Sequence, residues 1–461
     1  MGDRLGRKRT FLLTITIMGI STFLVGCLPN YHAIGIAAPI TLMILRILQG
    51  IALGGEYGGA TIYVAEFAPE DRRGAYTSWI QMTSGVGYFL SISVILSTQW
   101  CLGKTMFEEW GWRIPFLLCS VFLSISLYIR LKIQESPVFM KLKRNGGISK
   151  HPILETFGQW NNLKVVLIAL FGIIIAQSVM AFCGNFYAFY FLTQILKVDS
   201  IIASACVAIG LLICMPLIIL IGRLSDKMGR RRIMLVGCIL GTLSYFPVYH
   251  MMAKVSNPEL MAIQQAYPVV LYTDPTSCSW QISLTGHVEL KSACDKAKKS
   301  LANLGISYET RYLTTGHSPY ITIGQEKINP LSHRQLQLEQ DLKVKLMEWG
   351  YPLNTAPQHV HFGILCALVT YLLILSSMVY APQAACLVEL FPSRIRYTAM
   401  SLPYHLGNGL FGGMMPAIAY SVVAQTGNIY SGLWYPVILC GFCSVITFCF
   451  LPETYQRKID D

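Results

Sequence analysis

Charged residues are scarce in this chain. Asp, Glu, Lys and Arg make up 13% of its 461 residues, whereas apolar residues make up 53%. An ordinary soluble domain carries roughly 25% charged residues. The composition therefore excludes a water-soluble body and indicates that lipid surrounds most of the protein.

Motifs that carry enzyme chemistry are also missing. The sequence has no Gly-rich nucleotide-binding loop after a strand, no metal-ligand spacing and no plausible pairing of a nucleophile with a base. We therefore expect no enzymatic activity, no cofactor and no metal. Most of the 14 cysteines lie within or beside apolar segments, where cysteine is an ordinary packing residue.

Long apolar runs, by contrast, are abundant. Ten of them have about 19 to 28 residues, which is enough to cross the hydrocarbon core of a bilayer as a helix. They lie near residues 10–28, 40–63, 75–98, 113–131, 165–192, 201–221, 233–252, 362–388, 397–424 and 433–451. The sequence thus predicts an all-α membrane protein.

Lys and Arg residues gather in alternate connections between these runs. Most of the 36 lie in residues 1–9, 72–73, 130–164, 222–232, 394–396 and 457–458. Because positively charged short loops stay in the cytoplasm, we expect a multi-pass protein of the bacterial inner (plasma) membrane with both termini of this chain cytoplasmic. The same asymmetry accounts for the formal net charge of +12, so the lipid bilayer is an expected partner and nucleic acid is not.

Two motifs occur twice. The octet GDRLGRKR at residues 2–9 recurs as SDKMGRRR at 225–232, and Glu66, followed by Arg73, recurs as Glu389, followed by Arg396. The spacing between the copies implies two similar membrane halves, the second with roughly 100 extra residues, and such repeats are typical of transporters. The predicted parts are an N-terminal bundle at 1–131, a cytoplasmic central loop at 132–164, a C-terminal bundle at 165–252 and 358–452, and an insert at 253–357.

The insert follows a span that leaves the cytoplasm, so we expect it on the outer face. Apolar residues recur at helical spacing in 287–304 and 334–349, each followed by a glycine that can end a helix. Two stretches between them, 306–313 and 320–323, are typical of short strands. The sequence therefore predicts a small α+β extracytoplasmic domain.

Two cysteines of this insert, Cys278 and Cys294, lie in polar sequence. In an oxidising compartment they can form a disulfide that closes a short loop. Two unpaired thiols are the alternative.

Further motifs carry a resemblance to a known family. They are RILQG at 46–50, GGEYGG at 54–59, WGWRIPF at 110–116 and QESP at 134–137. With the repeated octets, they resemble the metabolite–proton symporter family of the major facilitator superfamily, whose members carry osmoprotectants such as proline and betaine, or carboxylates such as α-ketoglutarate, citrate and shikimate. The octets resemble the loops after family helices 2 and 8, so the ten spans correspond to family helices 3–12.

The resemblance implies a major facilitator fold and proton-coupled symport of a small polar organic solute into the cell. We expect the protein to be a monomer. It also implies that eight residues form a cytoplasmic salt-bridge gate that steadies the outward-facing state: Asp3, Arg7, Glu66, Arg73, Asp226, Arg230, Glu389 and Arg396. A carboxylate beside a tight turn can meet a helix N-terminus or an arginine of the neighbouring bundle. Topology signalling alone would explain the basic residues but not the fixed carboxylates.

Two charged residues, Arg46 and Glu56, lie within one predicted span. Inserting a charged side chain at the centre of a membrane helix costs about 2.5–3.5 kcal/mol of free energy. Their ten-residue separation corresponds to a rise of about 15 Å, so they cannot pair directly. By resemblance Arg46 senses the proton site and an anionic solute, with a structural role on backbone carbonyls as the alternative. Glu56 is either part of this pathway or a buried carboxylate in a glycine-rich packing site.

Other polar residues within spans are candidates for the proton and solute path. His405, with Asn408 one turn on, can titrate near neutral pH, although a lone histidine is also compatible with a structural role. Positions in the seventh and tenth family helices can line a midplane solute site: Gln177, Asn185, Tyr187, Tyr190, Tyr380 and Gln383.

Three alternatives to symport remain. A drug-efflux antiporter should carry a Gly-Pro signature in family helix 5, and residues 81–87 have no proline. A sensor would use the insert to bind a solute without moving it. An inactive truncated transporter is the third, because the first two family helices are absent while their counterparts at 165–192 and 201–221 are present. Under this alternative we expect Met1 to be an internal start, a truncated gene model or a decayed gene, and this polypeptide alone not to transport.

Overall fold

The computed structural model describes residues 2–279, 292–314, 318–330, 335–352, 360–455 and 457–459. In these residues, ten helices are long and apolar enough to cross a membrane, which confirms the predicted fold class. The spans are Arg7–Gly26, Ala37–Phe67, Glu70–Leu102, Arg113–Lys132, Trp160–Ile195, Ser200–Met228, Arg230–Ser256, Phe362–Leu390, Arg396–Thr426 and Ser431–Phe450.

The first half contains four of these spans. Helix α2 packs against both α4 and α7, and α5 completes the group. Glycines let α2 and α7 approach closely, since Gly19 faces Leu123 and Gly26 faces Phe116. The elements of this half are α1 (Gly2–Leu5), α2 (Arg7–Gly26), α3 (Tyr31–Ile34), α4 (Ala37–Phe67), η1 (Glu70–Arg72), α5 (Arg73–Leu102), α6 (Lys104–Met106), η2 (Phe107–Gly111) and α7 (Arg113–Lys132).

The second half contains six spans around a large apolar core. Tyr187, Phe191 and Tyr249 are fully buried at its centre and lie in mutual ring contact. Its first and fifth spans are interrupted by π-helical turns, which often occur at functional sites. The elements are α10 (Trp160–Ala169), η3 (Leu170–Ile174), α11 (Ile175–Phe182), η4 (Cys183–Tyr187), α12 (Ala188–Tyr190), η5 (Phe191–Ile195), α13 (Ser200–Met228), α14 (Arg230–Ser256), α18 (Phe362–Leu390), α19 (Arg396–Leu406), η9 (Gly407–Gly412), α20 (Met415–Thr426), η10 (Ser431–Leu433) and α21 (Trp434–Phe450).

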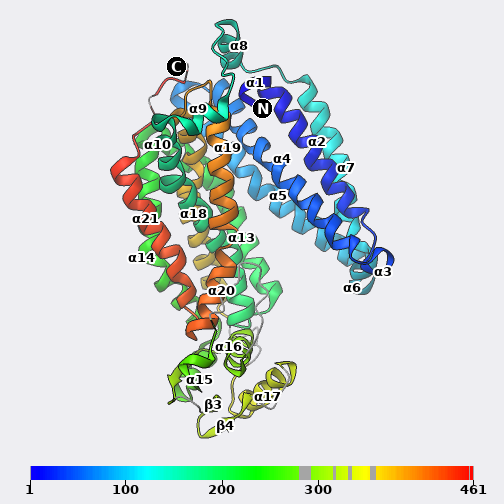
Figure 1. Cartoon of the computed structure of the whole chain (residues 1–461), viewed down its shortest axis with the longest axis vertical. Helices are drawn as coiled ribbons and strands as arrows, with labels where there is room; N and C mark the ends of the chain where they lie inside the picture. Colours follow the sequence, from blue (N-terminus) through cyan, green and yellow to red (C-terminus); the bar gives the residue numbers. More distant parts are fainter. Residues whose placement is uncertain are drawn as a thin grey trace.

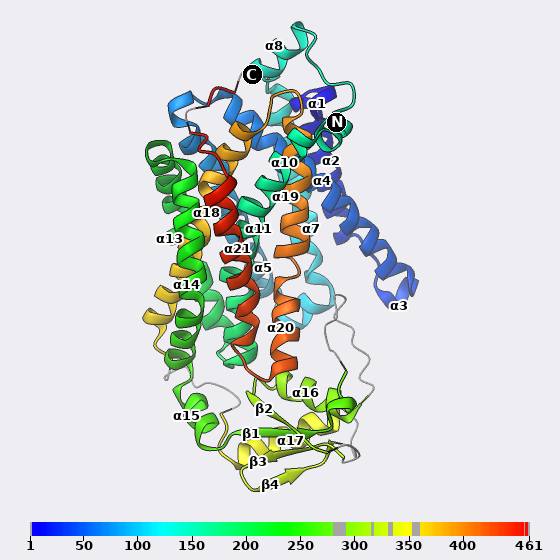
Figure 2. The same cartoon turned by 60° about the vertical axis from the view of Figure 1, so that its left-hand side comes forward.

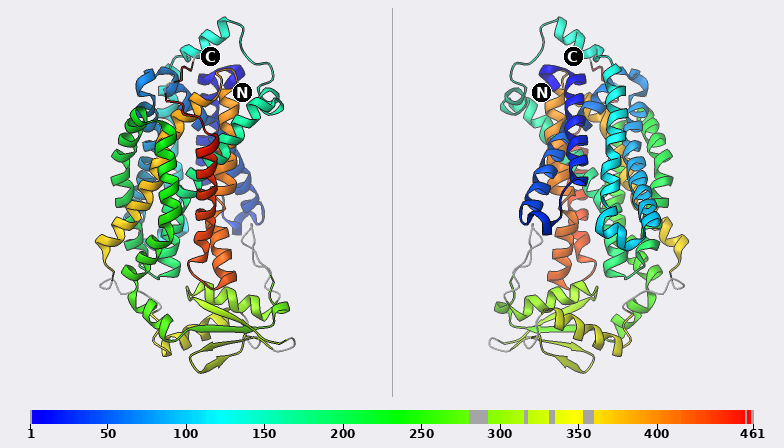
Figure 3. Two further views of the ribbon diagram at one scale, coloured as in Figure 1. Left: turned by 90° about the vertical axis from the view of Figure 1, so that its left-hand side faces the viewer. Right: turned by 90° about the vertical axis from the view of Figure 1, so that its right-hand side faces the viewer.

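The halves are joined at the end where both termini lie. Two short helices, α8 (Pro137–Arg144) and α9 (Pro152–Gly158), form this connection. The first-half helices lie against the second half at this end and diverge from it toward the opposite end, where the insert is found (Figures 1 and 3). The two halves therefore lie closest together toward the end that carries the termini.

The insert is a small α+β unit with its own core. Its sheet has the order β2-β1-β3-β4, with β1 parallel to β2 and antiparallel to β3. Residues of the sheet and of two helices, among them Leu271, Leu301 and Leu342, form a separate apolar cluster. The elements are α15 (Pro258–Ala266), β1 (Val269–Thr273), η6 (Pro275–Ser277), α16 (Ala293–Asn303), β2 (Tyr308–Tyr312), β3 (Tyr320–Ile323), β4 (Glu326–Ile328) and α17 (Gln335–Glu348).

Sequence analysis predicted the two helices and the two strands of this unit that carry the clearest periodicity. It did not predict β1 or β4, because short strands in a largely polar segment give little signal. Residues 287–291 of the predicted helix at 287–304 lie outside the described residues. Helix α14 also extends four residues past the expected boundary at residue 252, so the insert begins after Ser256.

The insert contacts the bundle through a few hydrogen bonds. Helix α16 lies between the sheet and the end of α20 (Figure 2). The Tyr308 N–H donates to Gly427 O at 2.9 Å, the Tyr420 hydroxyl to Asn303 Oδ1 at 2.7 Å, and Lys197 Nζ to Asn303 O at 3.1 Å. The ends of the insert are adjacent, since the His361 N–H donates to Val255 O at 3.2 Å.

We predict that replacing residues 258–359 by a short flexible linker leaves the membrane bundle folded. The two apolar cores are separate, and the adjacent ends of the insert can be joined without strain. Size-exclusion chromatography and thermal unfolding of the purified protein check this. The expected result is a monodisperse peak with a small change in the unfolding midpoint, whereas aggregation of the shortened protein would show that the bundle depends on the insert.

Candidate functional site

The two halves meet near the termini through two clusters of buried charges. The Glu389 cluster consists of Arg73 and Gly74 from the first half with Asp226, Arg230 and Glu389 from the second half. The Glu66 cluster exchanges the roles of the halves: it consists of Asp3, Arg7 and Glu66 from the first half with Arg396 and Tyr397 from the second half. Together the clusters contain all eight residues of the expected gate.

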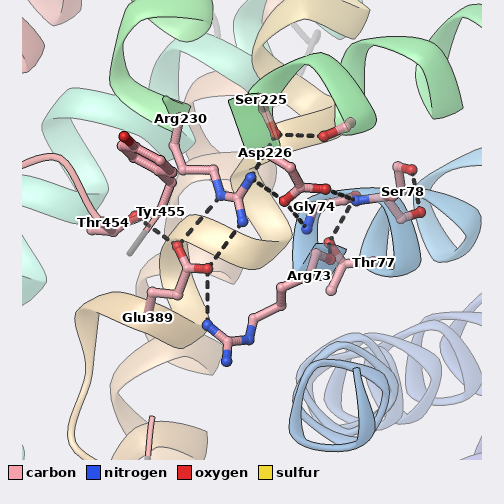
Figure 4. A network of polar contacts seen from close by, with 12 residues as sticks. Arg73, Gly74, Thr77, Ser78, Ser225, Asp226, Arg230, Glu389, Thr454 and Tyr455 are labelled. Atoms are coloured by element: carbon pink, nitrogen blue, oxygen red, sulfur yellow. Dashed lines mark hydrogen bonds and ion pairs between the residues drawn. The ribbon is translucent and has the colours of Figure 1, made fainter. Parts of the chain in front are cut away.

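In the Glu389 cluster, one carboxylate binds two guanidinium groups. Oε1 of Glu389 lies 3.1 Å from a nitrogen of Arg73 and 3.1 Å from a nitrogen of Arg230 (Figure 4). The Thr454 hydroxyl donates to Oε2 at 2.8 Å. All three ionised side chains are at most 1% exposed, so the pairing compensates for the loss of their hydration.

Asp226 joins the end of α13 to the start of α5. Its carboxylate accepts from the N–H groups of Gly74 and Ala75, both at 2.8 Å, and pairs with Arg230 at 2.6 Å. Gly74 and Ala75 lie in the first turn of α5, where N–H groups have no partner within the helix. An anion from one half therefore caps a helix of the other half.

The Glu66 cluster repeats this geometry. Oε1 of Glu66 lies 3.0 Å from Arg396 and 3.6 Å from Arg7, and the Ser136 hydroxyl donates to Oε2. Asp3 accepts from Tyr397 N at 3.1 Å and pairs with Arg7 at 3.3 Å. The cluster thereby caps the first turn of α19 as Asp226 caps α5.

Asp3 itself is completely buried. Desolvation raises the pKa of its carboxyl above the ordinary value, and the charge of Arg7 is the largest influence in the opposite direction. Hydrogen bonds from the Tyr397 and Thr398 N–H groups also favour its ionised form.

Sequence analysis missed two further carboxylates, Glu135 and Glu453. Glu135 accepts from the N–H of Arg7 at 3.0 Å, and Glu453 accepts from the N–H of Arg230 at 2.8 Å. Each follows the last span of its half and caps the helix that begins with the gate arginine. A paired signal was present, because Glu-Ser at 135–136 and Glu-Thr at 453–454 occupy equivalent places.

The repeated glycine before each arginine is explained by these caps. Gly6 has φ 104° and Gly229 has φ 100°, values that L side chains rarely adopt. A Cβ at either position would also meet the capping carboxylate, Glu135 or Glu453.

A family model described as the Major Facilitator Superfamily matches residues 1–271. The chain belongs to this superfamily. This superfamily consists of membrane transporters rather than enzymes, in agreement with the ten spans and with the charge clusters between two similar halves.

Curated relatives are bacterial transporters. The chain is 32% identical to the shikimate transporter of Escherichia coli over 305 residues, covering 62% of this chain and 67% of the relative. It is 34% identical over 248 residues to the proline/betaine transporter of Escherichia coli, covering 52% of this chain and 49% of the relative. The chain thus spans about half the length of the proline/betaine transporter.

Solved structures confirm the major facilitator fold. A double-tryptophan mutant of XylE aligns over 99% of this chain and 83% of its own with a TM-score of 0.62 and 17% identity. The proton:xylose symporter XylE bound to 6-bromo-6-deoxy-D-glucose aligns over 100% and 83% with a TM-score of 0.59 and 15% identity.

In this major facilitator chain, the two intramembrane charges have different partners. Glu56 pairs with Arg130 of α7 at 3.1 Å, and both side chains are partly buried. Arg46 donates to Gln49 Oε1 at 3.1 Å, and Gln49 donates to Thr22 Oγ1 at 2.9 Å. The two residues do not pair with each other, as their separation along the helix requires.

The remaining candidates for the solute path fall into three groups. Asn185 and Asn408 donate to carbonyls of their own helices, at 2.9 Å each. Tyr187 is fully buried among the aromatic core residues of the second half. Gln177 Oε1 and both amide atoms of Gln383 are buried without a hydrogen-bond partner among the described residues.

An aromatic cluster lies where the halves meet within the membrane. The rings of Tyr57 and Tyr404 stack with centroids 3.8 Å apart. Gln81 donates to the Tyr57 hydroxyl at 3.0 Å and to Tyr380 O at 3.1 Å, and His405 lies beside Gly54. Of these residues, only Tyr380 and His405 were among the predicted pathway positions. The Gly-rich stretch at 54–59 was a signal for Tyr57 that sequence analysis did not use.

We predict that Glu66→Gln and Glu389→Gln each destabilise the closed arrangement. Either change leaves two buried guanidinium groups without their shared carboxylate, and breaking such pairs costs about 3–5 kcal/mol, or roughly a hundredfold or more in the balance of states. Solute transport should therefore slow far more than solute binding weakens. Transport rates in cells and binding by the purified protein measure the two effects.

Asp71→Asn is the matched control. Asp71 pairs with Arg72, but both side chains are more than two-thirds exposed, and such surface pairs contribute only about 0–1 kcal/mol. The control should leave both transport and binding nearly unchanged. Equal loss of binding and transport in the glutamate variants would instead indicate a role in folding.

We further predict that Gly222→Val opens the end that carries the termini. A Cβ at Gly222 would lie 2.5 Å from the Ser78 hydroxyl and 2.7 Å from Gly74 O, and such overpacking costs about 1–3 kcal/mol. Labelling of a cysteine at the buried position Thr77 should increase. Gly87 lies on α5, as Thr77 does, and a Cβ there would have no neighbour within 4 Å, so Gly87→Val should leave labelling unchanged. Equal labelling in both variants would contradict the close contact of α5 with α13.

Proposed function

We propose that this protein is a proton-coupled symporter that carries a small polar organic solute, an osmoprotectant such as proline or betaine or else a carboxylate, into the cell. The single observation that carries the proposal is the pair of buried charge clusters that hold the halves together at one end. The names of the curated relatives support the solute class, and the named XylE structure supports the mode of coupling only through the shared fold.

The clusters have the chemistry that a reversible gate requires. Each central carboxylate has one guanidinium partner in its own half and one in the other half. When the halves rock apart, Glu66 keeps Arg7 and Glu389 keeps Arg230, so neither carboxylate becomes unpaired. Arg73 and Arg396 are released at helix starts that face the widening end, where water can hydrate them.

The expected orientation gives the gate its direction. Lys and Arg in the connections favour a cytoplasmic location for the termini, so the clusters close the cytoplasmic side and the divergent ends face outward. The predicted parts at 1–131, 132–164, 165–252 with 358–452, and 253–357 then become two rocking bundles, a cytoplasmic connection and an outer domain. Rocking of similar halves about a midplane site is the general mode of such carriers.

The proposed path for protons and solute lies between the halves. The Glu56–Arg130 pair is the candidate proton site, and Arg46 is a candidate partner for an anionic solute. Gln383 and Gln177 offer hydrogen-bonding groups without protein partners among the described residues. A polar solute can satisfy such groups, and buried polar atoms otherwise carry a cost.

A second candidate function is solute sensing by the insert. A cavity of about 760 Å³ lies between the insert and the outer end of the second half. Lys298, Tyr308, Glu309, Gln425 and Asn428 are among the residues that line it. Binding of solute by the protein without any transport would favour this candidate.

We predict that uptake depends on an inward proton gradient. Cells that produce the protein should accumulate labelled proline, betaine or a dicarboxylate, and a protonophore should abolish the accumulation. The purified protein should take up protons when the transported solute is added in weakly buffered solution. Uptake that persists unchanged after the gradient collapses would contradict proton coupling. The Glu56→Gln variant should no longer take up protons when solute is added, although its membrane bundle should remain folded.

A further inference from the structure

The insert places two cysteines at one turn of a strand–helix–strand unit. Strand β1 ends at Thr273, helix α16 begins at Ala293, and β2 returns parallel to β1. Cys278 follows β1, and Cys294 lies in the first turn of α16. The two are joined by a disulfide, with Cα atoms 5.3 Å apart. Both cysteines therefore lie at the connection between β1 and α16.

The two sulfurs have different surroundings. Cys294 is completely buried, whereas Cys278 is partly exposed. The Cys278 sulfur is therefore the one that an incoming group can reach. Cys294 is the second residue of an eleven-residue helix. The helix dipole favours a thiolate there, whereas burial of Cys294 in the apolar cluster of the insert opposes it.

The cysteines are held together by more than their covalent bond. The carboxylate of Asp295 accepts from the N–H of Ser279 at 2.9 Å and from its hydroxyl at 2.7 Å. This ties the segment after Cys278 to the first turn of α16. Ser292 caps the same turn through the N–H of Asp295 at 3.0 Å.

The apolar core of the insert supports the same arrangement. Apolar side chains from β1, β3, α16 and α17 pack together in this core, so these elements are held by more than the disulfide. Opening the disulfide therefore leaves both sulfurs close together. The disulfide therefore joins two segments that are also linked by the Asp295–Ser279 hydrogen bonds.

We propose that Cys278 and Cys294 form a thiol–disulfide exchange site for low-molecular-weight thiols. The thiolate of one thiol molecule attacks the Cys278 sulfur, the bond between Cys278 and Cys294 breaks, and Cys294 leaves as a thiolate beside the start of α16. A second thiolate attacks the sulfur that the first thiol molecule contributed to the mixed disulfide, and Cys278 leaves as a thiolate. Two thiols are thereby oxidised to one disulfide, and the two cysteines are reduced and take up the two protons.

The leaving Cys278 sulfur also has a nearby donor. Thr273 Oγ1 lies 3.5 Å from it, so its hydroxyl can donate to the departing thiolate. This activity is independent of the transport proposed above, because every contact that it uses lies within the insert.

The test uses the full-length protein, purified in detergent and equilibrated with defined ratios of reduced to oxidised glutathione. Free thiols are trapped by alkylation, and peptides are identified by mass spectrometry. The reduced fraction of the pair should follow the ratio reversibly. In the Cys294→Ser variant, glutathione should accumulate on Cys278 at least about tenfold above the wild-type level, because the resolving thiol is gone.

Two controls keep this result interpretable. Cys101→Ser removes an exposed cysteine outside the insert and should not change the reduced fraction of the pair. Cys278→Ser should abolish the mixed disulfide, since Cys294 is buried. If a variant fails to fold, the wild-type titration still decides: a pair that stays oxidised at every ratio, or glutathione bound equally to Cys294, would overturn the proposal.

Discussion

Ion pairs that are buried between two helix bundles impose the strongest constraint on this structure. Moving a carboxylate or guanidinium group out of water costs several kcal/mol per ion, and only a well-placed partner offsets that cost. Arg73 therefore requires Glu389 from the other half, and Arg396 requires Glu66. The ends of four helices from two halves must meet at one place for this to occur.

Several other features follow from this requirement. Gly6 and Gly229 turn the chain so that Glu135 and Glu453 can cap the helices that carry Arg7 and Arg230. The close approach of α5 to α13 brings Asp226 to the start of α5. The internal repeat supplies each part twice with the halves exchanged, and so the closed end is joined by two equivalent sets of contacts rather than by one.

The sequence made much of this arrangement predictable. The repeated carboxylates and arginines were predicted to form one gate from the family resemblance, and the ten spans followed from length and composition. The predictions for single helix positions were less informative. Asn185 and Asn408 bond to their own helices, and Tyr187 belongs to the core, because helix number alone does not determine which face of a helix points inward. The partner of Glu56, Arg130, lies 74 residues away and depends on how α4 and α7 pack.

The insert shows the same limit in a different form. Two of its helices, α16 and α17, were predictable from periodicity, whereas α15 was not predicted, and the parallel pairing of β1 with β2 arises only from tertiary contacts. That pairing is what brings Cys278 and the start of α16 together. The membrane bundle and the insert thus separate two kinds of chemistry in one chain: reversible ion pairing at one end and a cysteine pair at the other.

The distance between the halves at the end that carries the termini tests the central claim most directly. Spin labels at the exposed positions Arg72 and Lys227 report this distance by pulsed electron paramagnetic resonance. A short, narrow distribution is expected in the otherwise unaltered protein, and a shift to longer distances when Arg73→Gln and Arg396→Gln are combined. An unchanged distribution in that variant would contradict the claim that the buried pairs hold the halves together.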